Sequence, residues 1–157
     1  MSPPGSPGER YIVYTDGAAR GNPGPAGAGA LLLDPDGNRV AEVSEYLGRA
    51  TNNVAEYRAL LLGLECARDQ DVRDLEVRAD SELLVKQMRG EYRVRKPHLR
   101  ELWERARQLE GSFRRVEYVH VRRESNRDAD ALANRAVDAG SSLTDVQKAP
   151  PGRTKSL

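Results

Sequence analysis

The sequence is poor in the residues and runs that mark secreted and membrane proteins. It has 157 residues and a single cysteine, Cys66, so no disulfide framework can form within one chain. Cys66 lies in an apolar segment with helical spacing, which predicts a small core residue and not a nucleophile or a ligand. No apolar run is long enough to span a membrane, and the N-terminus lacks the hydrophobic segment of a secretory signal. These absences predict a cytoplasmic protein.

An excess of charge of either sign is also missing. The 25 lysines and arginines nearly cancel the 24 aspartates and glutamates, so overall charge gives no sign of a nucleic-acid partner. The cations gather in two segments, which either face a phosphate backbone or form solvated helix faces paired with nearby glutamates. The first holds Arg89, Arg93, Arg95, Lys96, Arg100, Arg105 and Arg107, and the second Arg114, Arg115, Arg122, Arg123 and Arg127.

The length suits one domain, which at this size buries roughly 68–70% of the surface of its unfolded chain. Segments rich in proline and glycine predict flexible tails at 1–9 and 141–157, around a domain at 10–140. Strands are expected at 10–15, 26–33, 39–47, 75–79 and 114–120, and helices at 52–68, 81–88, 97–109 and 126–139. Strands separated by helices favour parallel crossovers, whereas a turn sequence at 34–37 predicts an antiparallel hairpin. The expected fold is therefore α/β, with helices on a mixed sheet.

An acidic residue follows the first apolar run. Residues 11–14 are β-branched and aromatic and predict a buried strand, and the glycine-rich segment 17–29 predicts a flexible loop after it. Asp16 is therefore expected at a strand's end, where rigid scaffolds present reactive groups.

Two further acids have both a functional and a structural interpretation. Asn53 followed by Glu56 matches a capping box, and taken alone this pattern favours a capping role for Glu56. Asp80 closes an apolar strand and opens a helix, so it is either an N-cap or a second acid that converges with Asp16 at neighbouring strand ends.

The last predicted helix carries two more aspartates, Asp128 and Asp130. Both flank the apolar face formed by Ala129, Leu132 and Ala133, and the helical spacing alone does not choose between them. A solvated surface charge is the alternative for each.

Four motifs, taken in this order, resemble ribonuclease H of type 1. They are Tyr-Thr-Asp-Gly-Ala-Ala-Arg-Gly-Asn-Pro-Gly-Pro-Ala-Gly at 14–27, Thr-Asn-Asn-Val-Ala-Glu-Tyr at 51–57, Ala-Asp-Ser at 79–81 and Asn-Arg-Asp-Ala-Asp-Ala-Leu-Ala at 126–133. The resemblance runs from about Arg10 to about Ala139 and implies a ribonuclease H-like fold, with a five-stranded mixed sheet whose first three strands are antiparallel. It implies that the catalytic and metal-binding acids are Asp16, Glu56, Asp80 and Asp130, which selects Asp130 over Asp128 by analogy only.

The resemblance also implies an activity, the hydrolysis of the RNA strand of RNA–DNA hybrids with two Mg²⁺ ions, for which Mn²⁺ is an alternative. Two such ions about 3.5–4 Å apart activate a water and stabilise the leaving oxygen. Mg²⁺ prefers hard oxygen ligands, and four uncompensated carboxylates close together repel one another. Bound cations are therefore expected to be part of the working charge balance.

Substrate contacts follow from the same resemblance. Backbone N–H groups and side-chain amides in the two turns suit minor-groove contacts with 2′-hydroxyls and phosphates, although asparagine also serves turns and caps well. The expected contact residues are Asn22, Thr51, Asn52, Asn53, Ser81 and Arg122.

Two departures from the family pattern mark a short form. The segment 91–98 is too short for the basic insertion that holds substrate in many bacterial members. Residues 121–125 replace a loop that carries a histidine, with Arg122 nearest to its expected position and His120 interpreted as a structural residue at a strand end. Similar short enzymes of archaea and bacteria include some that cut double-stranded RNA, which makes it a candidate second substrate, and we expect a monomer.

Two other classes of function compete with this hypothesis. A non-catalytic module that binds hybrids has no need of four acids. A resolvase or transposase core would share the fold, but the sequence Thr-Asn-Asn-Val-Ala-Glu at 51–56 is typical of the ribonuclease branch.

Overall fold

The computed structural model describes residues 9–147. The predicted tail at 1–9, except Glu9, and the predicted tail from 148 onward lie outside the described residues. Within 9–147 no helix is long and apolar enough to cross a bilayer.

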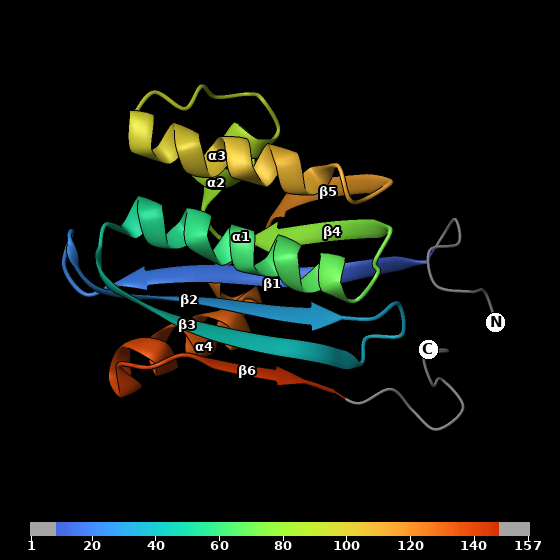
Figure 1. The fold of residues 1–157 in the computed structure, drawn as a ribbon, viewed down its shortest axis with the longest axis horizontal. Helices are drawn as coiled ribbons and strands as arrows, with labels where there is room; N and C mark the ends of the chain where they lie inside the picture. Colours follow the sequence, from blue (N-terminus) through green and yellow to red (C-terminus); the bar gives the residue numbers. More distant parts are fainter. Residues whose placement is uncertain (1–8, 148–157) are drawn as a thin grey trace.

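A mixed six-stranded sheet forms the centre of the molecule (Figure 1), with the spatial order β5-β4-β1-β2-β3-β6. The antiparallel part joins β1, β2, β3 and β6, and the parallel part joins β1, β4 and β5. The strands are β1 (Arg10–Ala19), β2 (Gly24–Leu33), β3 (Arg39–Ala50), β4 (Asp74–Ala79), β5 (Arg115–His120) and β6 (Leu143–Val146). The mixed α/β sheet and the antiparallel pairing of the first three strands are confirmed.

The prediction of five strands is wrong because β6 adds a sixth, inside the segment predicted as a flexible tail. All four residues of β6 are exposed, and the strand pairs with β3 from Ser44 opposite Leu143 to Ala41 opposite Val146. Backbone pairing, not burial of an apolar face, creates this strand. A sequence pattern that reports burial therefore misses it.

The predicted helices are confirmed to within one or two residues. They are α1 (Asn52–Asp69), α2 (Glu82–Met88), α3 (Pro97–Glu110) and α4 (Arg127–Ala139), with a 3₁₀ turn, η1 (Arg123–Ser125), before α4. Helix α1 contacts β1, β2 and α3 on one face of the sheet, whereas α4 contacts β1, β2 and β3 on the other (Figure 1).

The main core lies between the sheet and the layer of α1 and α3. Leu60 and Leu64 of α1 are fully buried against Val13 of β1, among other apolar side chains. Cys66 packs against this core, and burial raises the pKa of its thiol to about 11. The predicted core role of Cys66 is therefore confirmed, since a thiol that stays protonated is a poor nucleophile.

Helix α4 lies directly on strand β2 because two positions of that strand lack side chains. A Cβ on Gly27 would lie 2.3 Å from the carbonyl oxygen of Ala133, and one on Gly29 would lie 2.4 Å from that of Ala129. Gly29 pairs with Asp16 across the β1–β2 ladder. The close approach therefore brings the first turns of α4 next to Asp16.

Candidate active site

Asp16 lies inside strand β1 and not at its end, so the predicted position is corrected. Strand β1 continues to Ala19, so residues 17–19 form strand where the sequence predicted a flexible loop. They pair with residues 26–28 of β2, which were predicted as strand. The parallel pairing of β1 with β4, however, stops at Thr15 opposite Ala79. Asp16 is thus the first residue of β1 that extends past the end of β4.

Asp80 follows β4 directly, as predicted, but it does not cap the next helix. The N-cap of α2 is Ser81, whose hydroxyl accepts a hydrogen bond from the backbone N–H of Leu84. The Asp80 carboxylate instead accepts a hydrogen bond from the side-chain amide of Asn126, with a nitrogen to oxygen distance of 2.9 Å.

The predicted capping box at Asn53 and Glu56 is wrong. The N-cap of α1 is Thr51, two residues before Asn53, and its hydroxyl accepts from the backbone N–H of Val54. Glu56 therefore lies in the second turn, turned toward the sheet and only 6% exposed. Its Oε1 accepts a hydrogen bond from the backbone N–H of Gly17 across 2.8 Å.

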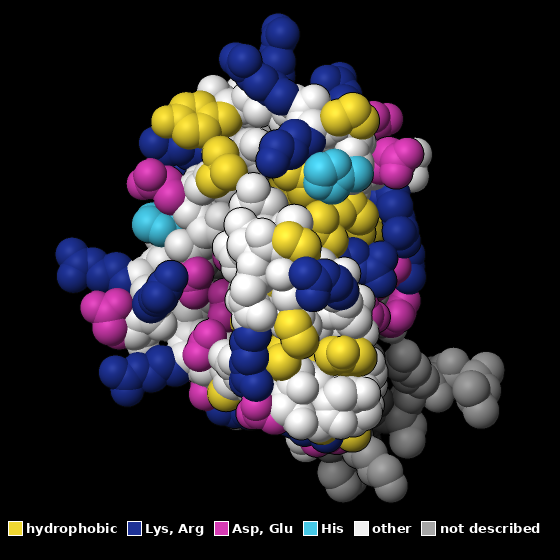
Figure 2. Space-filling model, turned by 90° about the vertical axis from the view of Figure 1, so that its left-hand side faces the viewer, with side chains coloured by type: hydrophobic (Ala, Val, Ile, Leu, Met, Phe, Trp, Pro, Cys, Tyr) yellow, Lys and Arg dark blue, Asp and Glu magenta, His cyan; other side chains and the backbone are white. Residues whose placement is uncertain are grey.

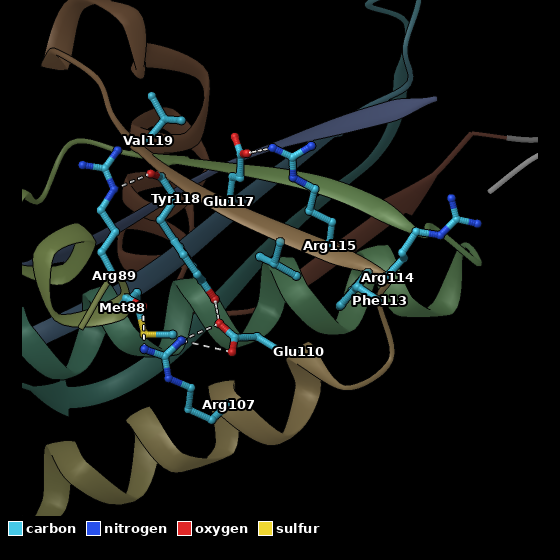
Figure 3. Close-up of a pocket in the computed structure, with 11 residues that line it drawn as sticks. Met88, Arg89, Arg107, Glu110, Phe113, Arg114, Arg115, Glu117, Tyr118 and Val119 are labelled. Atoms are coloured by element: carbon cyan, nitrogen blue, oxygen red, sulfur yellow. Dashed lines mark hydrogen bonds and ion pairs between the residues drawn. The ribbon is translucent and has the colours of Figure 1, made fainter. Parts of the chain in front are cut away.

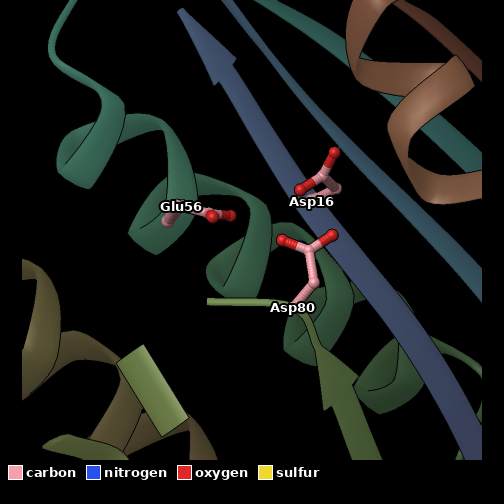
Figure 4. Close-up of side chains that lie close together, drawn as sticks. All are labelled: Asp16, Glu56 and Asp80. Carbon is pink, nitrogen blue, oxygen red and sulfur yellow. The ribbon is translucent and has the colours of Figure 1, made fainter. Parts of the chain in front are cut away.

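Three carboxylates from separate parts of the chain meet at this point. Asp16, Glu56 and Asp80 each offer an oxygen within 4.8 Å of the other two, and Figure 4 shows their side chains directed toward one another from β1, α1 and the end of β4. None of the three forms an ion pair with a lysine or arginine among residues 9–147. Any negative charge on the cluster is therefore not neutralised by a side-chain ion pair.

The electrostatics of the cluster reflect this crowding. Burial raises the pKa of Asp16, and the neighbouring charges of Glu56 and Asp80 raise it further. Burial also raises the pKa of Glu56, to about 8, although the hydrogen bond from Gly17 acts in the opposite direction. Acids that are buried together without cations are strained electrostatically, and a bound cation relieves that strain.

The structure separates the two aspartates of α4. Asp130 faces the cluster, and its carboxyl group also raises the pKa of Asp16, through a hydrogen bond and through its charge. The side-chain amide of Asn134 donates to the Asp130 carboxylate across 3.2 Å. Asp128 instead points away and pairs with Arg39 at 3.0 Å. Geometry thus places Asp130, and not Asp128, beside the other acids.

A cleft of about 510 Å³ surrounds the four acids. It is also lined by Asn52, Arg123, Glu124, Arg127 and Asn134, among others. Of the predicted contact residues, only Asn52 is part of its wall. Thr51 and Ser81 are helix N-caps, and the side-chain oxygen of Asn22 accepts from the backbone N–H of Asn52 at 3.0 Å. Asn53 is half-buried in the first turn of α1.

Arg122, predicted as a substrate contact, does not line the cleft, whereas its neighbour Arg123 does. Arg123 lines the cleft, and its charge lowers the pKa of Glu56, whereas Arg122 precedes the turn η1 and is exposed. The 3₁₀ turn determines which of the two arginines lines the cleft, and no pattern in the sequence predicts this turn. His120 is exposed at the end of β5, with Nε2 3.3 Å from the carbonyl oxygen of Asp80.

A second cleft, also of about 510 Å³, lies between α2, α3 and β5 and shares no lining residue with the acidic one (Figure 3). Its cations already have partners. Arg107 donates to both carboxylate oxygens of Glu110, which also accepts from the hydroxyl of Tyr118, and Arg89 donates to the backbone carbonyl of Tyr118. These contacts hold β5 against α2 and α3.

Comparison with known proteins agrees with this geometry. A family model described as reverse transcriptase-like matches residues 14–136. Ribonuclease HI of Halobacterium salinarum is 49% identical over 83% of this chain, and ribonuclease H of Prosthecochloris aestuarii is 34% identical over 82% of this chain and 96% of its own length. The chain belongs to the ribonuclease H type 1 family.

Solved structures of ribonucleases H share the fold. The crystal structure of RNase H1 from Halobacterium salinarum superimposes with a TM-score of 0.81, covering 83% of this chain and 98% of that one at 48% identity. LC11-RNase H1 in complex with an RNA/DNA hybrid gives 0.78, with the same coverage at 44% identity. This chain spans 66% of the length of the Halobacterium ribonuclease HI and 36% of that of a related bifunctional protein of Mycobacterium tuberculosis.

Proposed function

We propose that this protein is an endoribonuclease that hydrolyses the RNA strand of RNA–DNA hybrids and depends on divalent metal ions, two Mg²⁺ with Mn²⁺ as an alternative. The proposal rests on one observation in a member of the ribonuclease H family. Carboxylate oxygens of Asp16, Glu56 and Asp80 lie within 4.8 Å of one another, and Asp130 lies beside them. A family relative, LC11-RNase H1, has been crystallised with an RNA/DNA hybrid.

The donor set fits a hard divalent cation. All four side chains are carboxylates, which are the ligands that Mg²⁺ prefers, and Asp16 and Glu56 are buried with raised pKa values. When bound, two such ions would supply Lewis acidity to the phosphodiester group. The protein's own contribution is to hold the four carboxylates, from β1, α1, the end of β4 and α4, in one rigid cluster.

Cations around the acids suit a polyanionic substrate. Arg123 and Arg127 line the cleft itself, and Figure 2 shows acidic side chains gathered in the middle of one face with lysine and arginine side chains around them. Such an arrangement attracts a phosphate backbone toward the acids without neutralising them. Asn52, on the cleft wall, offers a side-chain amide to a 2′-hydroxyl or a phosphate.

A hybrid-binding module without catalysis is the competing function, and the site argues against it. A module that only binds hybrids has no need of four carboxyl groups at the phosphate-binding surface, because their ionised forms repel phosphate. Activity on double-stranded RNA, a monomeric state and a cytoplasmic location are parts of the same proposal that rest on the sequence alone.

One gel assay tests the proposal. Labelled RNA–DNA hybrid, duplex RNA and duplex DNA are each incubated with the protein in Mg²⁺, in Mn²⁺ or in a chelator. We expect cleavage of the RNA strand of the hybrid in metal and no cleavage in chelator, with duplex DNA intact. Cleavage in chelator rejects the metal-dependent mechanism, and an intact hybrid in every metal rejects the nuclease.

A further inference from the structure

Asn126 is a buried polar residue at the junction of η1 and α4. It is 1% exposed, and its side-chain amide donates two hydrogen bonds into the site. One goes to the backbone carbonyl of Thr15 at 3.0 Å and the other to Oδ2 of Asp80 at 2.9 Å.

The backbone of Asn126 makes a third connection. Its carbonyl oxygen accepts a hydrogen bond from the backbone N–H of Asp130 at 3.1 Å. Since Thr15 immediately precedes Asp16, this one residue touches the chain at or beside three of the four acids. It joins β1, the end of β4 and the first turn of α4.

Helix capping does not account for this side chain. Asn126 stands at the N-cap position of α4, but its side chain makes no capping hydrogen bond. Its Oδ1 is buried and has no hydrogen-bond partner among the described residues. A buried acceptor without a partner is unfavourable, so the residue carries a cost that the two bonds of its amide must offset.

We propose that Asn126 is a positioning residue that holds the Asp80 carboxylate toward Asp16 and Glu56 and thereby sets the affinity of the site for metal. The inference rests on the proposed function, because it takes the acids as metal ligands. A side chain that donates to a ligating carboxylate fixes its orientation, and removal of such a partner typically weakens metal binding by about 10- to 100-fold. Asn126 is too buried to touch a nucleic acid, so its influence on the substrate passes through Asp80.

The test compares Asn126→Ala with Ser44→Ala. Ser44 is equally buried and also ties α4 to the sheet, because its hydroxyl donates to the backbone carbonyl of Leu132, but it contacts no acid of the cluster. Mn²⁺ binding is measured by calorimetry well below the melting temperature of each variant, together with thermal unfolding in chelator. We expect Asn126→Ala to bind Mn²⁺ about 10- to 100-fold more weakly, and Ser44→Ala to lose stability while keeping the affinity of the wild type.

Hydrolysis kinetics give a second readout. At saturating metal we expect the KM of Asn126→Ala for the hybrid to match the wild type, and kcat to be lower. The metal concentration needed for half-maximal rate should be higher than in the wild type. If Asn126→Ala does not fold, Asn126→Ser takes its place, since a serine hydroxyl is too short and donates only one proton, and the same weakening is expected.

Unchanged Mn²⁺ affinity in the folded variant overturns the inference. A wild-type protein that binds Mn²⁺ in an Asn126-dependent manner but cleaves no hybrid rejects the nuclease and leaves the positioning role standing. A wild-type protein that binds no Mn²⁺ overturns both.

Discussion

The Glu56 carboxylate is held by the backbone of a strand, through the N–H of Gly17, and not by the helix that carries it. The contact is possible because Gly17 has no side chain: a Cβ there would lie 2.2 Å from the backbone carbon of Ala55. Helix α1 therefore approaches β1 as closely as two backbones can, and Glu56 is buried beside Asp16. Gly17, which follows Asp16, is thus required for the close packing of α1 on β1 at the site.

This relationship predicts the effect of Glu56→Gln. The amide oxygen of glutamine can still accept from Gly17, so we expect the variant to melt at or slightly above the temperature of the wild type. The loss of a ligand charge should lower turnover by about 100-fold or more. Glu65→Gln, on the half-exposed side of the same helix, is the control and should retain full rate. A Glu56→Gln enzyme with an unchanged rate would leave Glu56 a purely structural role.

Replacing the central acids should separate activity from stability. We expect Asp16→Asn and Asp80→Asn to abolish hybrid cleavage, because charge is lost and shape is kept. Asp16 is buried and its pKa is raised by its neighbours, so Asp16→Asn should also stabilise the metal-free protein by about 1 kcal/mol or more, which is about 2–4 °C per kcal/mol in melting temperature at this length. Near-normal turnover in both variants would reject the metal site.

The raised pKa values predict how the metal-free protein responds to pH. Burial lifts the pKa of Glu56 from its ordinary 4.5 to about 8, and that of Asp16 rises as well, so the folded chain binds more protons than the unfolded chain between these values. The stability that these groups contribute is therefore complete below about pH 4 and is lost as the pH rises through about 8.

Thermal unfolding in chelator checks this sign. We expect the melting temperature to fall between pH 6 and pH 8, and Mg²⁺ to raise it more at pH 8 than at pH 6, since the metal binds ionised acids. The double variant Asp16→Asn/Glu56→Gln should lose most of this dependence. A wild-type protein that is more stable at pH 8 than at pH 6 in chelator contradicts the assignment.

The sequence predicts those parts of the site that rest on regular pairing. Asp16 and Asp80 follow two apolar runs separated by a helix, and neighbouring parallel strands bring the ends of such runs together, as β1 and β4 do at Thr15 and Ala79. The sequence also predicts the helices closely, because their apolar spacing reports the core. The error at Glu56 came from the position of the N-cap: it is Thr51, two residues before Asn53, and Glu56 therefore lies in the second turn and faces the sheet.

The remaining features depend on contacts that no local pattern encodes. Strand β6 is exposed throughout, and β1 extends past Asp16 only because β2 supplies a partner. Which aspartate of α4 faces the site depends on how the helix rests on Gly27 and Gly29. The buried contacts of Asn126 likewise become visible only once the three elements are assembled.

The two aspartates of α4 give a direct test of that packing. Asp130→Asn should lower turnover strongly, because its carboxyl group faces the cluster and interacts with Asp16. Asp128 is 61% exposed on its side chain and pairs with Arg39, so Asp128→Asn should keep its rate and cost about 0.2–1 kcal/mol of stability at most. Initial rates and melting curves of the two variants measure these effects on turnover and stability. An inactive Asp128→Asn beside an active Asp130→Asn would mean that α4 is rotated relative to this structure.

The loop before α4 predicts an electrostatic role for an arginine where many relatives carry a histidine. Arg123 lines the cleft and its charge reaches Glu56, whereas Arg122 is exposed outside it. An arginine stays charged at every accessible pH, so it can hold a phosphate but cannot carry a proton. We therefore expect Arg123→Ala to slow cleavage about 10-fold and Arg123→Lys to recover part of that loss, since the point charge remains.

Hybrid binding as a function of salt distinguishes a phosphate contact from a structural effect. Loss of one contact should reduce the slope of log K against log salt by about 1 in Arg123→Ala, measured in chelator, and leave it unchanged in Arg122→Ala. His120→Ala should alter turnover little, because its ring meets only the backbone carbonyl of Asp80 at the end of β5. A large loss of rate in His120→Ala, with an unchanged rate in Arg123→Ala, would contradict this prediction. It would show that a histidine moves the proton and that the loop at 121–125 lies differently relative to the acids.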